Sequence, residues 1–421
     1  MMTQITGCPS AVEHIRQSVA YADGQWVGEV DDVRIRSVFQ PIYSLVHSRM
    51  VGVEGLIRCA DTQGQVIPPL EMLARADREE SKAVHLDRLC RYLHLNNLRV
   101  HVPEAYWLFM NVSARTVIAG KNYGTYFAEL LHCLDFPAHR VVIEILEDNI
   151  RDEQLLASAV EYYRELGCII AIDDFGAGNS NFNRVWQISP DIVKLDRSLV
   201  VRAKTDGRTW RALPSLVEML RESGCLVLME GIETEQEAVI AVKSGVDMVQ
   251  GYYFARPSLR AEPCRPVPEA MRHIQGQFIE ATRHAAIHLG SRLKPYVESF
   301  QFVLDRLRAG YPFEASVAEL MGLPLVSRSY MLDHEGVQHL ESVSGQASSE
   351  NGRFDILTRG AGADWSTRSY YRRAIQSPGQ VQITTPYLSV ADADICITLS
   401  IADTLNGQVR VVCCDLRWEE L

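Results

Sequence analysis

Residues 168–178 read Cys-Ile-Ile-Ala-Ile-Asp-Asp-Phe-Gly-Ala-Gly, an apolar run that ends in two adjacent carboxylates and a glycine-rich segment. The run predicts a buried strand, so Asp173 and Asp174 stand where that strand becomes a loop. Two carboxylates this close ionise together only at a high electrostatic cost unless a multivalent cation lies between them. The pair therefore predicts a site for one or two divalent metals, with further ligands supplied from elsewhere in the chain.

Other apolar runs finish in the same way, each on a polar residue suited to metal or phosphate. These end residues are Glu54, Asn111, Glu144, Lys194, Glu230 and Gln250. Between the runs, segments such as 153–166 and 211–223 carry apolar residues every three or four positions, as helices do. With Val38-Phe39 ahead of Gln40 counted as one more run, eight strands alternate with helices over roughly 220 residues. This rhythm predicts an α/β fold, a (β/α)₈ TIM-like barrel whose polar strand ends face one mouth.

A series of short motifs resembles, in order and spacing, the series found in EAL-domain cyclic di-GMP phosphodiesterases. The motifs are Glu54-Gly55-Leu56-Ile57-Arg58, Asn111-Val112-Ser113, Glu144-Ile145-Leu146-Glu147, Asp173-Asp174-Phe175-Gly176, Lys194-Leu195-Asp196, Glu230-Gly231-Ile232-Glu233 and Gln250-Gly251. The resemblance covers residues 34–260. It implies a barrel with one antiparallel strand, cyclic di-GMP as substrate, a two-metal site for Mg²⁺ or Mn²⁺, and linear pGpG as product.

Two departures from the family pattern stand out. The signature Glu-Ala-Leu reads Glu54-Gly55-Leu56, which keeps the acidic ligand and changes a small neighbour. The loop after the aspartates reads Gly-Asn-Ser-Asn at 178–181, where the family more often has Tyr-Ser-Ser. The first departure leaves the expected chemistry unchanged, and the second concerns the ordering of that loop.

Divalent cations bound by oxygen can neutralise a phosphodiester, supply hydroxide near neutral pH and align its attack. The expected metal ligands are Glu54, Asn111, Glu144, Asp173 and Asp174. Lys194 would orient the attacking water, and Glu230 would either ligate the second metal or act as general base. The expected substrate contacts are Gln40, Arg58, Asp196 and Gln250. The expected supports of the ligand-bearing loops are Glu147 and Glu233. Ca²⁺ is expected to permit binding and to inhibit catalysis, because its looser geometry holds the attacking water poorly.

Each residue also has a purely structural interpretation, since a carboxylate or asparagine at a strand end commonly caps a helix. The joint occurrence of the whole set favours the metal centre. Two other functions fit part of the pattern: a catalytically silent cyclic di-GMP receptor that signals through its conformation, and a metal-dependent nuclease. The net charge of −11 disfavours the nuclease and any long nucleic-acid partner, because proteins that bind polyanions usually carry a basic stripe.

The rest of the chain predicts an N-terminal extension over residues 1–33, a helical linker over 261–310 and a regulatory α+β domain over 311–421. Short alternating strands are expected at 380–383, 395–399 and 408–412, with Asn406-Gly407 as a hairpin turn. This last region resembles PAS-like and Cache sensor domains through segments 365–371, 385–388 and 414–416. The resemblance implies a small-molecule pocket at Arg368, Tyr387 and Asp415. Alternatively, the aromatic residues form the core of a dimerising domain.

Partners and location follow from the remaining composition. No apolar run approaches the length of a membrane span, and residues 1–23 lack the features of a signal peptide, so a cytoplasmic protein without a membrane partner is expected. The ten cysteines contain no Cys-x-x-Cys pair, which favours reduced packing cysteines. The apolar stripe of the linker helix could pack on its own domains or on a second chain. We expect a homodimer and an unidentified ligand of the C-terminal domain.

Overall fold

The computed structural model describes residues 9–102, 106–112, 125–146, 153–177, 182–264, 266–346, 359–389 and 394–418. The chain divides into two compact units, Met1–Glu280 and Ala281–Leu421. Each unit has its own β-sheet and its own hydrophobic core. Of the expected site residues, Glu147 lies outside the described residues.

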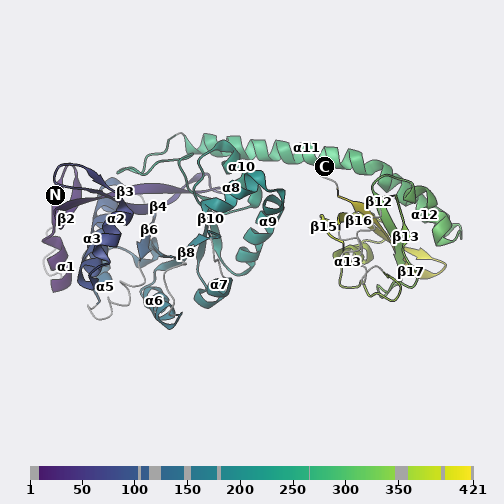
Figure 1. Ribbon diagram of the computed structural model, residues 1–421, viewed down its shortest axis with the longest axis horizontal. Coiled ribbons are helices and arrows are strands. Elements are labelled where there is room, and N and C mark those ends of the chain that lie inside the picture. Colours follow the sequence, from purple (N-terminus) through teal and green to yellow (C-terminus); the bar gives the residue numbers. More distant parts are fainter. Residues whose placement is uncertain are drawn as a thin grey trace. The chain divides into compact units, whose positions relative to one another are not determined.

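Eight strands of the first unit close into a barrel (Figure 1). They are β3 (Val33–Ser44), β4 (Arg49–Ala60), β6 (Trp107–Val112), β7 (Val141–Leu146), β8 (Ile169–Phe175), β9 (Ile192–Leu195), β10 (Leu226–Met229) and β11 (Met248–Val249). The ring runs β3-β11-β10-β9-β8-β7-β6-β4, and pairing between β4 and β3 closes it. β3 is antiparallel to both of its ring neighbours, whereas the other ring pairs are parallel. The predicted barrel with one antiparallel strand is confirmed.

Helices connect the barrel strands: α3 (Glu80–His101), α5 (Tyr126–Cys133), α6 (Glu153–Glu165), α7 (Phe182–Ile188), α8 (Arg197–Thr205), α9 (Gly207–Glu222) and α10 (Glu235–Ser244). Local capping fixes where several of them begin. The Asp206 carboxylate accepts from the first backbone N–H groups of α9, and Thr234 with Glu237 forms a capping box at the start of α10. The segments expected at 153–166 and 211–223 are α6 and the greater part of α9.

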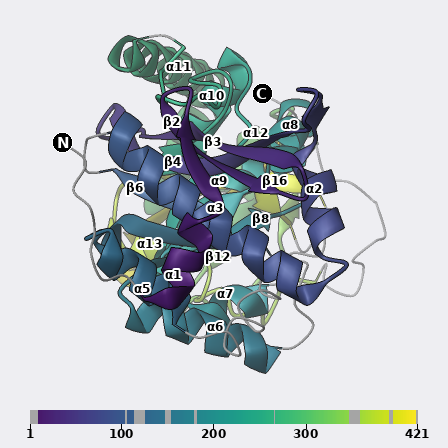
Figure 2. The same ribbon diagram turned by 90° about the vertical axis from the view of Figure 1, so that its left-hand side faces the viewer.

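Strands β3 and β4 extend beyond the ring and carry a small additional sheet. There β1 (Val19–Ala22) pairs with β2 (Gln25–Val30), β2 pairs with β3, and β5 (Val66–Ile67) pairs with β4. Helices α1 (Ser10–Arg16) and α2 (Pro69–Ala76) belong to the same unit. One face of the β3–β4 ladder packs against α3 (Figure 2). On this face, Ser37 and Phe39 contact His94. The other face is buried at Gln40 and Glu54, and half-buried or exposed further along the ladder towards Arg34 and Ala60.

The boundary between the two units falls within one long helix, α11 (Val267–Arg308). Its first turns contribute Met271 and Ile274 to the core of the barrel unit. Its last turns contribute Leu293, Phe300 and Leu304 to the core of the second unit. The helix is continuous through Pro295.

The second unit is built on an antiparallel sheet in the order β13 (Val343–Ser344), β12 (Val326–Leu332), β17 (Gln408–Arg417), β16 (Ile395–Leu405), β14 (Gln382–Ile383), with β15 (Tyr387–Leu388) also paired to β16. Helices α12 (Phe313–Met321) and α13 (Ser369–Gln376) accompany it. The β16–β17 hairpin turns at Asn406 and Gly407, with φ of 50° and 77°, so the predicted two-residue turn is confirmed. The resemblance to PAS and Cache domains stays a prediction.

Two further features of the described residues bear on the sequence analysis. None of the helices in the described part of the chain combines the length and apolar character needed to cross a bilayer. The described cysteines are not paired in disulfides, and most of them are buried. They therefore act as small apolar side chains in the cores.

Candidate metal centre

The C-terminal ends of the parallel barrel strands bring the expected ligands to one mouth. Parallel strands in a closed ring place the residues at their ends around a common opening, whatever their separation in sequence. The residues and their positions are Glu54 on β4, Asn111 on β6, Glu144 on β7, Asp173 and Asp174 on β8, Lys194 on β9, Glu230 directly after β10 and Gln250 directly after β11. The strand register sets several of them side by side, since Asn111 pairs with Glu144.

A β-bulge allows both aspartates to enter the site. In a regular strand, neighbouring side chains point to opposite faces. Here β8 pairs with β9 at Ile172 and again at Phe175, so Asp173 and Asp174 together oppose the single residue Lys194. Asp174 adopts a left-handed backbone conformation with φ of 57°, which aspartate tolerates better than most residues. Carboxylate oxygens of Asp173, Asp174 and Glu230 consequently lie within 4.8 Å of one another.

Lys194 lies among the carboxylates. Its side chain is 1% exposed, and Nζ lies 3.0 Å from Asp173 Oδ1 and 2.6 Å from Glu230 Oε1. Nζ also forms an ion pair with Glu144, which is fully buried. Burial lowers the pKa of Lys194, but Asp173 and Glu144 outweigh it, so the net pKa is raised well above the ordinary value. The ammonium therefore stays charged, and a surface lysine is not the right description of this residue.

The carboxylates carry more negative charge than one lysine can balance. Burial raises the pKa of Glu144 well above its ordinary value; Lys194 opposes this shift, and Glu54 and Asp173 add to it. Burial also raises the pKa of Glu230 to about 8, again against Lys194 and with Asp173. Both shifts have the same first cause, the burial of the carboxyl group away from water, and the neighbouring carboxylates add to it.

Glu54 is held by two amides that come from strands on either side of β4. Asn111 Nδ2 donates to Glu54 Oε1 at 2.9 Å, and Gln250 Nε2 donates to Glu54 Oε2 at 2.7 Å. The position of Gln250 depends on the next residue, Gly251, whose backbone packs closely against that of Ile232. A Cβ on residue 251 would lie 2.1 Å from the carbonyl oxygen of Ile232, so this close packing requires glycine. The two hydrogen bonds from Asn111 and Gln250 orient the Glu54 carboxylate.

The glycine of the Glu-Gly-Leu motif has a packing reason. A Cβ on Gly55 would lie 2.9 Å from Cγ of His94 on α3. The imidazole is 5% exposed, and its Nδ1 is hydrogen-bonded to Ser37 Oγ at 3.0 Å. Burial lowers the pKa of His94 to about 4, so the ring is neutral. His94 fills the space that an alanine methyl would need, a relation between distant residues that sequence reasoning missed.

The other expected residues have varied surroundings. Gln40 is buried on β3, opposite Glu54 in the ladder, and its Nε2 donates to Ala255 O at 3.4 Å. Arg58 is exposed and donates to the carbonyl of Ile57. Asp196 caps α8 by accepting from Ser198 N, which is the structural role considered for such residues. Glu233 forms two 2.6 Å contacts with Arg197, a partner that the sequence did not indicate.

The donor set fits divalent metal. Within the described residues, Glu144 Oε2 and Gln250 Oε1 are buried without a hydrogen-bond partner, and buried polar atoms normally find one. Carboxylate and amide oxygens without sulfur or imidazole suit Mg²⁺, Mn²⁺ or Ca²⁺. Cations at this site would favour the charged forms of Glu144 and Glu230, which burial and the neighbouring carboxylates disfavour. Glu54, Asn111, Glu144, Asp173, Asp174 and Glu230 would hold them.

The family model described as "EAL domain" matches residues 28–257, more than half of the chain. The chain belongs to the EAL-domain family. Its match to the uncharacterised EAL-domain protein YkuI of Bacillus subtilis is 27% identical over 354 residues, 81% of this chain and 84% of YkuI. The crystal structure of YkuI, described as a complex with the substrate c-di-GMP and calcium, aligns with a TM-score of 0.76 at 23% identity, over 92% of this chain and 97% of that one. The two-unit fold is therefore shared with YkuI.

Among EAL-domain relatives described as enzymes, the cyclic di-GMP phosphodiesterase RocR of Pseudomonas aeruginosa is 27% identical over 236 residues. The match covers 54% of this chain and 58% of RocR. PdeL of Escherichia coli, also described as a cyclic di-GMP phosphodiesterase, is 25% identical over 52% of this chain and 61% of that protein. The chain thus shares about half its length with these two enzymes.

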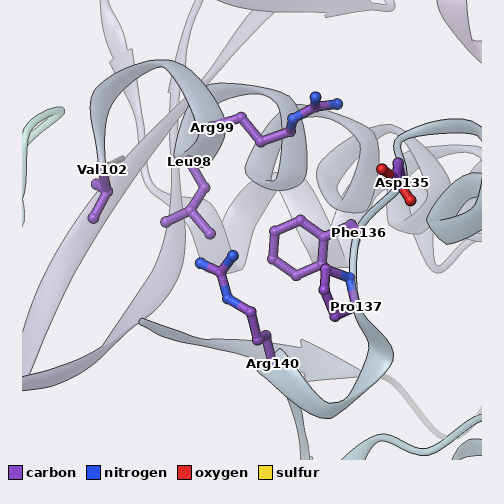
Figure 3. Close-up of a pocket in the computed structure, with 7 residues that line it drawn as sticks. All are labelled: Leu98, Arg99, Val102, Asp135, Phe136, Pro137 and Arg140. Carbon is purple, nitrogen blue, oxygen red and sulfur yellow. The ribbon is translucent and has the colours of Figure 1, made fainter. Parts of the chain in front are cut away.

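A separate cavity of about 210 Å³ lies elsewhere on the EAL domain (Figure 3). It is lined by Leu98, Arg99, Val102, Asp135, Phe136, Pro137 and Arg140. Arg140 directly precedes β7, at the end of the strand opposite Glu144, and its guanidinium carbon lies 4.9 Å from the Phe136 ring centroid. The cavity is therefore not part of the candidate metal centre.

The second unit contains a buried polar cluster around Asp415. Its carboxylate accepts from Arg328 Nε at 2.6 Å and from Thr398 Oγ1 at 2.7 Å, and the Tyr387 hydroxyl lies 2.6 Å from Thr398 Oγ1. Two of the three expected sensor residues, Tyr387 and Asp415, therefore share one hydrogen-bonded network. Arg368 is exposed, with its guanidinium carbon 5.9 Å from the Trp365 ring, and the arginine that reaches Asp415 is Arg328.

Proposed function

We propose that this EAL-domain chain hydrolyses cyclic di-GMP to linear pGpG with two divalent cations, Mg²⁺ or Mn²⁺. One observation carries the proposal: oxygens of Asp173, Asp174 and Glu230 lie within 4.8 Å of one another, next to the charged Lys194. The description of RocR and PdeL as cyclic di-GMP phosphodiesterases supports the substrate. The c-di-GMP and calcium in the YkuI crystal structure support a divalent cation beside the nucleotide.

The reaction breaks one of the two equivalent phosphodiester bonds of the ring. The oxygen of water bonds to phosphorus, the bond from phosphorus to the 3′ oxygen breaks, and the product carries a 5′ phosphate and a free 3′ hydroxyl. One proton leaves the attacking water, and one proton is delivered to the departing 3′ oxygen. When bound at these ligands, divalent cations would neutralise the phosphate oxygens and acidify the water.

The protein groups have distinct tasks in this scheme. Lys194 stays protonated and places positive charge beside Asp173 and Glu230, where it orients the attacking water and stabilises charge on the phosphate. Two roles are open to Glu230, that of a metal ligand and that of the acceptor of the water proton. Asn111 and Gln250 hold the Glu54 carboxylate in place, which fixes the geometry of the site.

We further propose that the second unit adjusts this activity without entering the chemistry. The candidate catalytic residues all belong to the first unit, and the helix that joins the two units is embedded in both cores. A ligand or packing change in the second unit would act through this helix, with a coupling of about 1–3 kcal/mol. Tyr387→Phe removes one hydroxyl of the Asp415 network, and basal hydrolysis is expected to remain near normal.

The deciding experiment incubates the purified full chain with cyclic di-GMP and Mg²⁺ or Mn²⁺, and separates pGpG by chromatography. Wild-type protein should form pGpG, and Glu54→Gln and Asp173→Asn should abolish its formation because each loses a metal ligand. Asp206→Asn is the matched control, since it removes a carboxylate of the same domain that caps α9 and asparagine also caps helices.

Full activity in excess EDTA, or wild-type turnover by either ligand variant, would contradict the proposal. Binding of cyclic di-GMP without formation of pGpG under any cation would identify the chain as a receptor. Replacement of Mg²⁺ by Ca²⁺ should preserve binding and suppress turnover.

A further inference from the structure

On the face of the β3–β4 ladder that carries Glu54, successive residue pairs lie at increasing distances from the candidate metal centre. Directly paired residues on this face are Gln40 with Glu54, then Val38 with Leu56, then Arg36 with Arg58. Pairs two residues apart along an antiparallel strand are separated by about 7 Å. The arginine pair therefore stands about 14 Å along the ladder from the Glu54 ligand.

The burial of these pairs changes with distance from the centre. Gln40 and Glu54 are buried, Val38 and Leu56 are half-buried, Arg36 is half-buried and Arg58 is exposed. The opposite face of the same strands packs against α3 and is buried. Val38 and Leu56 thus form an apolar surface between the metal ligands and the two arginines, and the flat face of a base could pack on this surface.

The direct pairing of two arginines across an antiparallel ladder is electrostatically unfavourable and therefore calls for an explanation. Cβ atoms of paired residues lie about 5 Å apart, and like charges there are destabilising. Asp23 offsets part of the repulsion, because its Oδ2 lies 2.6 Å from NH2 of Arg36. Its side chain is 61% exposed, and such exposed ion pairs are weak enough to yield to a ligand. Both arginine side chains leave the strands on the face that carries Glu54.

We infer that Arg36 is a specificity-determining residue that reads the guanine edge of the bound dinucleotide, as the partner of Arg58. The inference rests on the proposed function. With a phosphate at the metal ligands, a base that extends along the ladder covers Val38 and Leu56 and brings its far edge to the arginine pair. Guanine presents the acceptors O6 and N7 on that edge, which an arginine fork contacts with two hydrogen bonds. Adenine presents an amino donor in place of O6, which a guanidinium cannot pair with.

The test is a binding measurement on the full chain by isothermal titration calorimetry in Ca²⁺, with pGpG formation monitored by chromatography. Arg36→Gln and Arg36→Lys are titrated with cyclic di-GMP and, by competition, with cyclic di-AMP. Arg34→Gln is the matched control: it lies on the same face one step further, paired with Ala60 instead of an arginine. Steady-state kinetics in Mg²⁺ supply kcat and KM separately.

Arg36→Gln should weaken cyclic di-GMP binding roughly tenfold and reduce the preference over cyclic di-AMP by a similar factor. KM should rise with kcat nearly unchanged, because the contact lies away from the reacting phosphate. Arg36→Lys should recover little, since lysine lacks the planar fork, and Arg34→Gln should behave as wild type.

Equal weakening for both dinucleotides would show that Arg36 contacts phosphate and overturn the assignment to guanine. Unchanged binding by Arg36→Gln, with wild-type protein binding normally, would overturn any role for Arg36 in recognition. If wild-type protein binds no cyclic di-GMP, the proposed function itself fails, and this outcome is distinct from the other two.

Discussion

Restoring the family's usual alanine in the signature motif should damage this particular protein. The Cβ introduced by Gly55→Ala would lie 2.9 Å from Cγ and 3.1 Å from Nδ1 of the His94 ring. The ring has little freedom to retreat, because it is buried, bonded to Ser37 and packed near Phe39. Overpacking of this kind costs about 1–3 kcal/mol. At roughly 3 °C per kcal/mol for a domain of this size, the EAL-domain transition should move down by about 3–9 °C.

Differential scanning calorimetry of the full chain measures this shift, and a double-mutant cycle identifies its cause. His94→Ala should be destabilising by itself because it leaves a cavity. The double variant Gly55→Ala/His94→Ala should be more stable than the sum of the single effects predicts, by about 1 kcal/mol or more. Gly276→Ala is the control, since a Cβ there meets no atom within 4 Å and alanine in a helix is favoured by up to about 1 kcal/mol.

Two results would refute the reasoning: strictly additive effects of the two substitutions, or a Gly55→Ala protein as stable as wild type. A functional readout accompanies the stability measurement. Glu54 is the adjacent residue, so displacement of the strand should also weaken metal binding, measured by calorimetric titration with Mn²⁺.

Three further predictions concern the metal centre and the boundary between the units. Lys194→Met should lower kcat by on the order of 10² or more with a much smaller change in cyclic di-GMP affinity; steady-state kinetics with kcat intact would contradict its role. Because the native pKa of Glu230 is raised to about 8, metal-free protein should lose stability as pH rises from about 4.5 to 8, which thermal unfolding at each pH measures. Mn²⁺ binding releases protons and should therefore tighten over the same range; titrations in buffers of different ionisation enthalpy measure the affinity and the protons released, and a pH-independent affinity would contradict the shift. A chain ending at Glu280 should keep a folded barrel, as measured by circular dichroism. A chain ending at Pro263 should be several kcal/mol less stable, because it loses Met271 and Ile274, each 0% exposed. Equal melting temperatures of the two truncated chains would contradict this prediction.

The sequence predicts the barrel and the polar residues at its mouth because both depend on local patterns. An apolar run followed by an acidic or amide residue indicates the end of a buried strand. Closure of the strands into a ring then places these ends around one mouth, so no long-range contact has to be predicted separately. Asp173, Lys194 and Glu230 were predictable in this way, and the structure brings them within ion-pair distance.

Relations that depend on register or on packing between distant elements were not predictable. The fit of His94 against Gly55 joins α3 to β4, and neither residue carries a local signal of it. The pairing of Arg36 with Arg58 follows only from the register of the β3–β4 hairpin, which contains an irregularity between Ile42 and Tyr43. The 42-residue helix α11 was evident from its periodicity, but the division of its apolar residues between two cores was not.

The left-handed conformation of Asp174 decides which substitution is informative there. Asparagine keeps the shape of the side chain and tolerates the same backbone angles, so Asp174→Asn removes a charge and little else. The left-handed backbone conformation is unfavourable for alanine. Asp174→Ala would therefore remove the carboxylate and also favour a regular strand in place of the bulge, which would reorient the Asp173 side chain. The activity lost in Asp174→Ala would therefore include the effect of displacing Asp173, and an alanine scan would overestimate the contribution of Asp174.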